Sequence, residues 1–410
     1  MREISRARFL GMAAAGTAAA VLPAARTGAA VLPAGRAGAA VLPAGRTGAA
    51  VLPAGRTGAA VLPAGRAGAA AGGRGLTYRG AVYEVADGET PGTAWSARRM
   101  RGDLRALAHD LHANSVKVTG DGVERLAATA AEAAERGLHV WLEPTLGDVP
   151  ERDILDHLAE TGRRAEGLRR QGAGVHLSVG CEFLLYVPGI VPGADAEERI
   201  DNLLKGAYDP VTTARRLRRF TARAAGVGRS VFRGRLTYAA AQDEDVDWRL
   251  FDLVGLDYYG FFRHRDAYVR DLARYTRFGK PVAVMEFGCC TFEGAPERGG
   301  MGWDVVDRTK EPPEIEEGIV RSEHAQAAYL TEVLSVFESM GLYSAMAYTF
   351  VTPDAPHRPH DPRHDLDTAS YALVRTVEDR RPGAPHTAGR YWEPKESFHA
   401  LARHYARHGR

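Results

Sequence analysis

The chain has 410 residues, 45% of them hydrophobic, which is enough for one large core or two ordinary domains. Charged residues make up 25% and the formal net charge is +2, so the composition has no strong excess of one sign. It therefore favours neither nucleic acid nor a membrane surface as a partner. The three cysteines, Cys181, Cys289 and Cys290, are an odd number, which excludes a complete disulfide framework.

The first 20 residues have the pattern of a secretory signal. Three arginines lie within Met1–Arg8, and Phe9–Leu22 is almost wholly small or apolar. Residues 5–10, Ser-Arg-Ala-Arg-Phe-Leu, resemble a twin-arginine signal, although the two arginines are not adjacent. We expect export to the cell envelope or the medium. The apolar stretch is too short to span a bilayer, so the mature chain is expected to have no integral membrane segment.

Residues 21–75 are a low-complexity segment. Val21–Ala70 consists of five copies of the decapeptide Val-Leu-Pro-Ala-(Gly/Ala)-Arg-(Ala/Thr)-Gly-Ala-Ala. Proline and arginine interrupt each apolar run, so the repeats cannot bury enough surface to offset chain entropy. We expect a disordered segment here, and a folded domain over residues 76–410.

From Leu76 onward, short β-branched runs alternate with longer helical patterns, which is typical of a parallel sheet with helical crossovers. The predicted strands are Gly80–Val85, Ser115–Thr119, Leu138–Glu143, Val175–Glu182, Gly234–Ala240, Leu253–Tyr259, Pro281–Phe287 and Ser344–Phe350. Eight strand–helix units in this length predict an α/β fold, a (β/α)8 TIM barrel. A doubly wound sheet is the alternative, but the glycine-rich nucleotide-binding turn is missing after the first strand.

Two strands end in a glutamate that alternation directs into the barrel. In Val175–Glu182, the residues Val175, Leu177, Val179 and Cys181 are apolar and suited to pack on helices, so Glu182 is predicted to face inward. The strand Pro281–Phe287 is apolar until Glu286, a charge that is costly to bury without a reason. By the same alternation Lys117 and Glu143 are predicted to point inward.

Glycoside hydrolysis needs two carboxyl groups that flank one glycosidic oxygen, one to donate a proton and the other to attack the anomeric carbon. Glu182 and Glu286, on the fourth and seventh strands, could meet at the mouth of a closed barrel, where like charges raise the pKa of one of them. Each could instead be a salt-bridged residue at a strand end. The pair of inward glutamates favours the catalytic interpretation.

The strand ends resemble those of clan A, the retaining (β/α)8 glycoside hydrolases. The motifs that carry the likeness are Val179-Gly180-Cys181-Glu182-Phe183, Gly255-Leu256-Asp257-Tyr258-Tyr259 and Val284-Met285-Glu286-Phe287-Gly288. The resemblance implies a carbohydrate substrate, no cofactor, Glu182 as acid/base and Glu286 as a nucleophile that forms a covalent glycosyl–enzyme intermediate. It further implies that Tyr258 or Tyr259 donates a hydrogen bond to the nucleophile. The chain is also similar to bacterial proteins labelled abortive phage infection protein.

Three positions depart from the clan pattern and leave the sugar open. Cys181 stands where the clan usually has an asparagine, Lys117 is the nearest match to its arginine, and Thr349-Phe350 stands where the last strand usually ends in tryptophan. Lys117, Glu143 and Asp257 are expected to line the sugar-binding floor. A non-catalytic carbohydrate-binding or phage-defence-related barrel is therefore the alternative function.

Three further features have open interpretations. Trp303 could stack on a sugar or plug a long loop. Cys289 and Cys290 could form a vicinal disulfide, but two packed thiols are favoured. A histidine-rich segment could bind a metal, although its spacing fits no tight site and we predict none; it contains His357, His360, Asp361, His364 and Asp365.

Overall fold

The computed structural model describes residues 75–86, 95–242, 244–377 and 391–407. The predicted signal segment, and the repeats up to Arg74, lie outside the described residues. In the described part of the chain, no helix is both long and apolar enough to cross a membrane.

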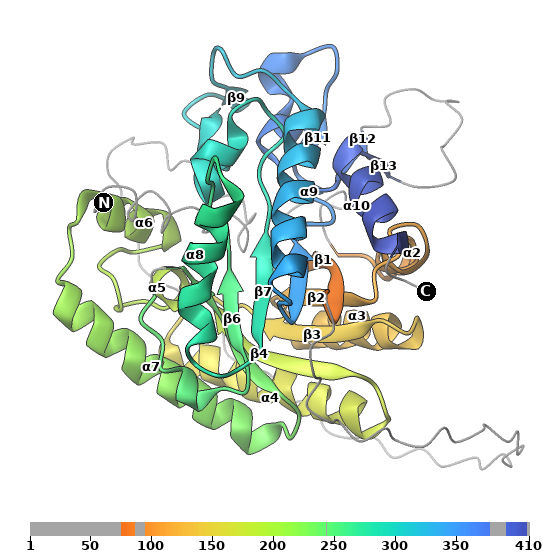
Figure 1. Cartoon of the computed structure of the whole chain (residues 1–410). Helices are drawn as coiled ribbons and strands as arrows, with labels where there is room; N and C mark the ends of the chain where they lie inside the picture. Colours follow the sequence, from red (N-terminus) through yellow and green to blue (C-terminus); the bar gives the residue numbers. More distant parts are fainter. Residues whose placement is uncertain (1–74, 87–94, 243, 378–390, 408–410) are drawn as a thin grey trace, which may run out of the picture. The chain divides into compact units, whose positions relative to one another are not determined.

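Eight parallel strands close into a barrel, which confirms the predicted (β/α)8 fold (Figure 1). Around the barrel the strand order is β1-β10-β7-β6-β5-β4-β3-β2, so neighbours in sequence are neighbours in space. Their bounds are β1 Tyr78–Val85, β2 Ser115–Gly120, β3 His139–Pro144, β4 Val175–Cys181, β5 Leu236–Ala241, β6 Val254–Asp257, β7 Val282–Phe287 and β10 Ser344–Ala347.

Helices lie outside the strands, as Figure 1 shows. They are α2 Ala97–His109, α3 Val123–Glu135, α4 Glu151–Arg170, α5 Phe183–Tyr186, α6 Ala196–Lys205, α7 Pro210–Val231, α8 Arg265–Thr276, α9 Glu323–Ser339 and α10 Glu396–Arg407. The loops after β7 and β10 carry 3-10 turns and the short strands β8 Val306–Asp307, β9 Glu314–Ile315, β11 Pro356–His357, β12 Val374–Val377 and β13 Trp392–Pro394.

Helix α7 illustrates how local sequence sets these elements. Asp209 caps the helix by accepting hydrogen bonds from the amides of Val211 and Thr212, and Pro210 occupies the first turn. Leu217 and Phe220 lie on its buried face. The helix ends at Val231, before the extended Phe232.

Aromatic rings fill the end of the barrel where the strands begin. His139 stacks on Tyr78 with ring centroids 4.0 Å apart, and His176 contacts Trp141 at 4.7 Å. Burial lowers the pKa of His176 to about 4, so this ring is neutral at pH 7. The polar site therefore has to form at the opposite end, the barrel mouth, where the strands finish.

A β-bulge decides what β4 presents at the mouth. Leu177 and Ser178 of β4 pair with Leu236 and Thr237 of β5, and the next pair is Cys181 with Ala239. This pair lies three residues further along β4 but two further along β5, so β4 holds one extra residue. Our alternation placed Cys181 on the helix side, and this was wrong, because the bulge at Gly180 resets the pattern. The Cys181 thiol lies 3.6 Å from the Thr145 hydroxyl, at the mouth.

A second bulge precedes Glu286. Leu256 of β6 pairs with Val284, whereas the adjacent Asp257 pairs with Glu286, so β7 also holds one extra residue. Both predicted catalytic glutamates thus follow a bulge, a device that re-aims a side chain at a barrel rim.

Gly180 is the residue that permits the β4 bulge. Its φ is +139°, and a Cβ there would lie 2.6 Å from the packed ring of Phe183. We expect Gly180→Ala to lower the free energy of unfolding by about 1–3 kcal/mol and to displace Glu182. Urea denaturation measures the first effect.

Gly226→Ala in α7 is the matched control, because a Cβ at Gly226 meets nothing within 4 Å and its backbone is not left-handed. We expect it to be neutral or to stabilise by up to about 1 kcal/mol. Equal stability of the two variants would contradict the role given to Gly180.

Candidate active site

A buried lysine organises the polar groups at the barrel mouth. Lys117 of β2 is 0% exposed, and its Nζ lies 2.7 Å from Glu143 Oε1, 2.7 Å from Glu286 Oε1 and 3.9 Å from Asp257 Oδ1. Burial lowers the pKa of Lys117, but the three carboxylates outweigh burial and raise it well above its ordinary value. Lys117 is therefore a permanent cation, and we call it and these carboxyl groups the Lys117 cluster.

Glu286 has two stabilising partners. Lys117 binds Oε1, and the Tyr259 hydroxyl donates to Oε2 at 2.8 Å. Burial raises the pKa of Glu286 above its ordinary value and Glu143 adds to this rise, while the Lys117 charge and the two hydrogen bonds lower the pKa part of the way back. Tyr258, the other predicted donor, lies elsewhere: its hydroxyl donates to Asp271 of α8 at 3.0 Å, and its ring packs on Phe337 of α9.

Glu182 lies at the mouth with a different environment. Its side chain is 2% exposed, and its Oε1 is buried without a hydrogen-bond partner in the described structure. Burial raises its pKa well above the ordinary value, and the nearby charges of Asp257 and Glu286 raise it further. Glu182 adopts a left-handed backbone with φ +40°, a costly conformation for a residue with a Cβ.

Glu244 fixes the turn that follows Glu182. Its Oε1 accepts the Leu184 amide at 3.1 Å, and its Oε2 accepts the Tyr238 hydroxyl at 2.6 Å and the Ala241 amide at 3.2 Å. The Tyr238 hydroxyl also accepts the Phe183 amide at 2.7 Å. These contacts join the end of β4 to the end of β5.

Asp257 and Glu143 complete the cluster. Both carboxyl oxygens of Asp257 are buried without a hydrogen-bond partner in the described structure, and burial raises its pKa well above the ordinary value. Glu143 Oε1 accepts from Thr119 at 2.9 Å as well as from Lys117. The predicted floor residues therefore do come together.

Sequence reasoning missed two residues at this mouth. The Tyr348 hydroxyl donates to Glu84 Oε1 of β1 at 2.7 Å. Strand β10 ends at Ala347, not at Phe350 as predicted, so Tyr348 stands at the strand end where tryptophan was sought. Like Glu286, Glu84 is a charged residue near the end of its strand, so the same sequence criterion could have identified it.

Trp303 and the paired cysteines lie in the long loop after β7. The Arg308 guanidinium sits 5.1 Å from the Trp303 ring centroid, and the indole Nε1 is buried without a hydrogen-bond partner among the described residues. None of the described hydrogen bonds or ion pairs joins Trp303 to the Lys117 cluster. Cys289 and Cys290 are buried free thiols, as favoured.

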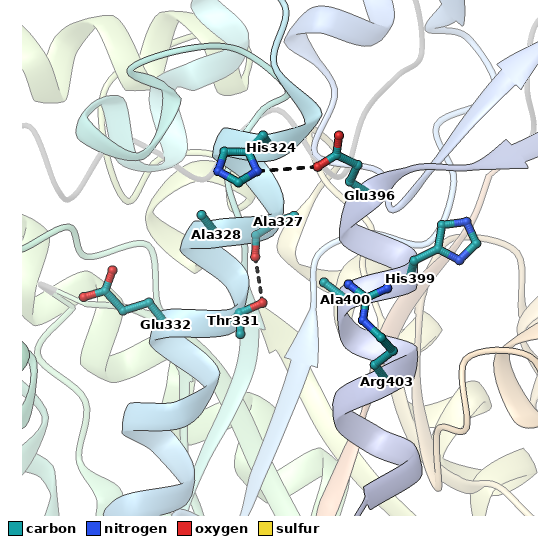
Figure 2. A pocket seen from close by; sticks show the side chains of 9 residues that line it. All are labelled: His324, Ala327, Ala328, Thr331, Glu332, Glu396, His399, Ala400 and Arg403. Atoms are coloured by element: carbon teal, nitrogen blue, oxygen red, sulfur yellow. Dashed lines mark hydrogen bonds and ion pairs between the residues drawn. The ribbon is translucent and has the colours of Figure 1, made fainter.

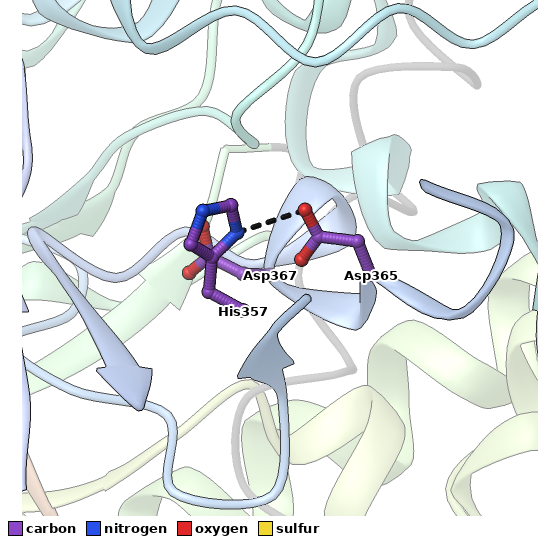
Figure 3. Close-up of side chains that lie close together, drawn as sticks. All are labelled: His357, Asp365 and Asp367. Atoms are coloured by element: carbon purple, nitrogen blue, oxygen red, sulfur yellow. Dashed lines mark hydrogen bonds and ion pairs between the residues drawn. The ribbon is translucent and has the colours of Figure 1, made fainter. Parts of the chain in front are cut away.

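Part of the histidine-rich segment enters an ion-pair network. His357, Asp365 and Asp367 place one ligand atom each within 4.8 Å of one another (Figure 3). However, Lys395 Nζ lies 2.8 Å and Arg321 Nη2 2.6 Å from the two oxygens of Asp367, so cations already neutralise it. The chemistry of this site fits a structural network and disfavours a metal ion.

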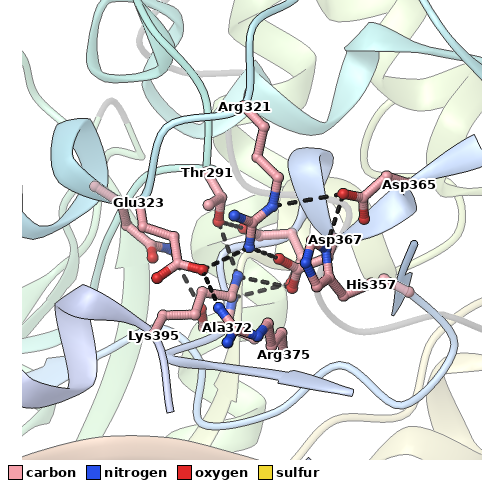
Figure 4. A network of polar contacts seen from close by, with 12 residues as sticks. Thr291, Arg321, Glu323, His357, Asp365, Asp367, Ala372, Arg375 and Lys395 are labelled. Atoms are coloured by element: carbon pink, nitrogen blue, oxygen red, sulfur yellow. Dashed lines mark hydrogen bonds and ion pairs between the residues drawn. The ribbon is translucent and has the colours of Figure 1, made fainter. Parts of the chain in front are cut away.

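This network connects the two long loops at the mouth. Lys395 also donates to Thr291 at 2.8 Å, just after β7, and Arg321 binds Glu323 at the start of α9 (Figure 4). Asp365 and Asp367 belong to the loop after β10. The loops after β7 and β10 are thereby tied to α9 and α10.

A shallow groove lies on the outer surface, between α9 and α10 (Figure 2). None of its lining residues belongs to the Lys117 cluster; they are His324, Ala327, Ala328, Thr331, Glu332, Glu396, His399, Ala400 and Arg403.

Comparisons with known proteins give structural likeness only. No protein-family model matches the sequence, no curated protein matches it, and nothing supports the resemblance to abortive phage infection proteins. A calcium-binding mutant of Bacteroides uniformis β-glucuronidase 2 aligns with TM-score 0.49 and 16% identity, over 80% of this chain and 34% of that one. This chain thus spans about a third of that protein's length.

Two smaller proteins align over most of their own length. A GH5-4 broad-specificity endoglucanase from Clostridium longisporum has TM-score 0.45 and 9% identity, over 75% of this chain and 86% of that one. A glycoside hydrolase family 5 enzyme from Prevotella bryantii has TM-score 0.43 and 9% identity, over 80% and 95%. At such scores these likenesses identify neither a substrate nor a mechanism for this chain.

Removing Lys395 tests the loop network. Lys395 is 0% exposed, so Lys395→Met leaves the Asp367 carboxylate buried with less compensation. We expect the free energy of unfolding to fall by about 3–5 kcal/mol in a denaturant titration. A chelator should leave the melting temperature of the wild-type chain unchanged.

The control is Lys205→Met, since Lys205 pairs with Asp201 on the surface with side chains 67% and 59% exposed. It should cost about 1 kcal/mol or less. Similar losses from both variants, or a melting temperature that drops with chelator, would refute this account of the network.

The raised pKa of Glu244 predicts that the stability of the folded chain depends on pH. Burial raises its pKa from 4.5 to about 7, although its hydrogen bonds lower it. Between these values the unfolded chain has lost the proton that the folded chain keeps, so the free energy of unfolding falls as pH rises. In Glu244→Gln this fall should be smaller than in the wild-type chain, measured by urea titrations from pH 4.5 to 7.

Glu293→Gln, at an exposed position, should follow the wild-type pH profile. If Glu244→Gln also follows the wild-type profile, Glu244 does not hold its proton in the folded chain.

Proposed function

We propose that the chain is a glycoside hydrolase that acts on a carbohydrate by double displacement, with Glu286 as nucleophile and Glu182 as general acid/base. The observation that carries the proposal is the asymmetry between the two glutamates. Glu286 receives hydrogen bonds from Lys117 and Tyr259, which favour its ionised form. Glu182 has a buried oxygen without such a partner, which favours its protonated form.

The reaction then follows from these protonation states. The Glu286 carboxylate attacks the anomeric carbon while Glu182 gives its proton to the glycosidic oxygen, and the alcohol leaves. An ester now joins the sugar to Glu286. The ionised Glu182 takes a proton from water, the water oxygen attacks the anomeric carbon, and the Glu286 carboxylate is released. This mechanism requires the two carboxyl groups to lie about 5–5.5 Å apart, and that spacing stays a prediction.

The other members of the cluster have supporting tasks in this proposal. Lys117 on one oxygen and the Tyr259 hydroxyl on the other favour the ionised form of Glu286 and hold its carboxyl group in position. Burial of the site strengthens each electrostatic interaction. Asp257 and Glu143 offer oxygens that can accept hydrogen bonds from sugar hydroxyls.

Two substitutions test the roles. With aryl glycosides that wild type hydrolyses, Glu286→Gln should lower kcat/KM by about 10⁴-fold or more, because no covalent intermediate can form. Glu182→Gln should lower it by about 10²–10⁴-fold for poor leaving groups, and much less for dinitrophenyl glycosides, which leave without a proton.

A mechanism-based 2-fluoro glycoside should label Glu286, as peptide mass spectrometry would show, and azide should rescue Glu182→Gln by forming a glycosyl azide of retained configuration. Glu293→Gln, an exposed glutamate in the loop after β7, is the control and should retain wild-type kinetics. Labelling at another residue, or full activity of Glu286→Gln, would reject the assignment. Sugar binding without turnover would favour the non-catalytic barrel.

A further inference from the structure

The barrel mouth holds more acid than the proposed reaction uses. Besides Glu182 and Glu286, carboxyl groups are contributed by Glu84 of β1, Glu143 of β3 and Asp257 of β6. Lys117 is the cation that pairs with Glu143, Asp257 and Glu286. Even with Lys117, the mouth is rich in carboxyl oxygens that accept hydrogen bonds.

Several of these acids have carboxyl oxygens without a hydrogen-bond partner. Glu182 Oε1, Glu143 Oε2 and both oxygens of Asp257 are buried without a hydrogen-bond partner in the described structure. A buried oxygen without a donor costs free energy, so a bound molecule that brings donors is favoured here. The strongest such donor is a cationic group.

Glu84 is the most accessible of these acids. It is partly exposed, whereas Glu143 and Asp257 are 0% and Glu182 is 2% exposed. Its Oε1 accepts from Tyr348, and Oε2 has no partner among the described residues. The ring of Tyr348 lies 6.3 Å from that of Tyr259, the residue that binds Glu286, so Glu84 borders the proposed reaction centre.

On the basis of the proposed function, we infer that this site prefers glycosides of amino sugars that carry a free ammonium group, and that Glu84 binds that group. The ammonium would donate to Glu84 Oε2 and reduce the repulsion between the acids. A uronate carboxylate only accepts hydrogen bonds, so it would supply no donor to Glu84 and would oppose its ionisation. A hydroxyl would supply a neutral donor and so gain less.

A metal ion is a poorer occupant than an ammonium group. Within the described ranges, three acidic, histidine or cysteine ligands converge within 4.8 Å only at His357, Asp365 and Asp367, away from this cluster. Lys117 Nζ already occupies the point where Glu143 and Glu286 meet. An ammonium carried by a sugar at Glu84 needs no such convergence.

The protonation state of Glu84 links binding of the amino sugar to pH. Burial raises the pKa of Glu84 to about 8. The Tyr348 hydrogen bond and the Lys117 charge lower the pKa, and Glu286 and Asp354 raise it. Binding an ammonium would favour the ionised carboxylate, so a proton would leave as the sugar binds. Proton release distinguishes this site from a simple hydroxyl contact.

The test uses the full chain with Glu286→Gln, which prevents turnover, and three β-1,4-linked tetrasaccharides, of glucosamine, glucose and glucuronate. At pH 6 and low salt, calorimetry should show the glucosamine tetramer binding at least about tenfold more tightly than the glucose tetramer. The glucuronate tetramer should bind most weakly. The preference should shrink in 0.5 M NaCl, and two buffers of different ionisation enthalpy should reveal the released proton.

Adding Glu84→Gln, which keeps an acceptor for Tyr348, should reduce the preference for the glucosamine tetramer to about twofold or less. Glu293→Gln in the same background is the control and should retain it. Equal binding of the glucosamine and glucose tetramers, binding of none of the three, or a preference that survives Glu84→Gln would overturn the inference. Labelling of Glu286 in the wild-type chain is read separately, so failure of the proposed reaction is distinguishable from failure of this preference.

Discussion

The site depends on one buried cation. Lys117 is fully enclosed, and its Nζ contacts Glu143 and Glu286 at 2.7 Å each. Removing a charge from water is costly, and only the facing carboxylates compensate for it. The same contact lowers the pKa of Glu286, which burial and the neighbouring Glu143 raise. Through these ion pairs, the neighbouring strands β2 and β3 are joined to β7, which is adjacent to neither of them in the barrel.

The chemistry of the mouth comes from differences among similar residues. Glu182 and Glu286 are both buried glutamates at strand ends, yet Lys117 and Tyr259 donate hydrogen bonds to Glu286, whereas Glu182 Oε1 has no such partner in the described structure. Burial raises the pKa of both, but only Glu286 has two hydrogen bonds that lower it again, and this difference suits the proposed pairing of an acid with a nucleophile. Glu244 fixes the turn after Glu182, because its carboxyl oxygens accept hydrogen bonds from backbone amides.

The long loops are stabilised by charge more than by regular structure. Asp367 lies between Lys395 and Arg321, and so joins the loop after β10 to the start of α9 and α10. Buried and multiply paired, this network differs from the exposed pairs on the outer helices, which contribute little. It explains why histidines and aspartates gather in a segment where a metal could be suspected.

The sequence by itself determined the alternation of strands and helices, hence the closed barrel, and the acids that end the fourth and seventh strands. These follow from local periodicity, which survives in any tertiary context. It did not reveal that Cys181 faces the mouth, that Tyr259 and not Tyr258 binds Glu286, or that Glu84 and Tyr348 join the site. Only the tertiary structure decided these points. Tyr259 and Tyr348 find their acceptors on other strands, and one extra residue in β4 changes the face that Cys181 occupies. Such bulges depend on register with neighbouring strands that lie far away in the sequence.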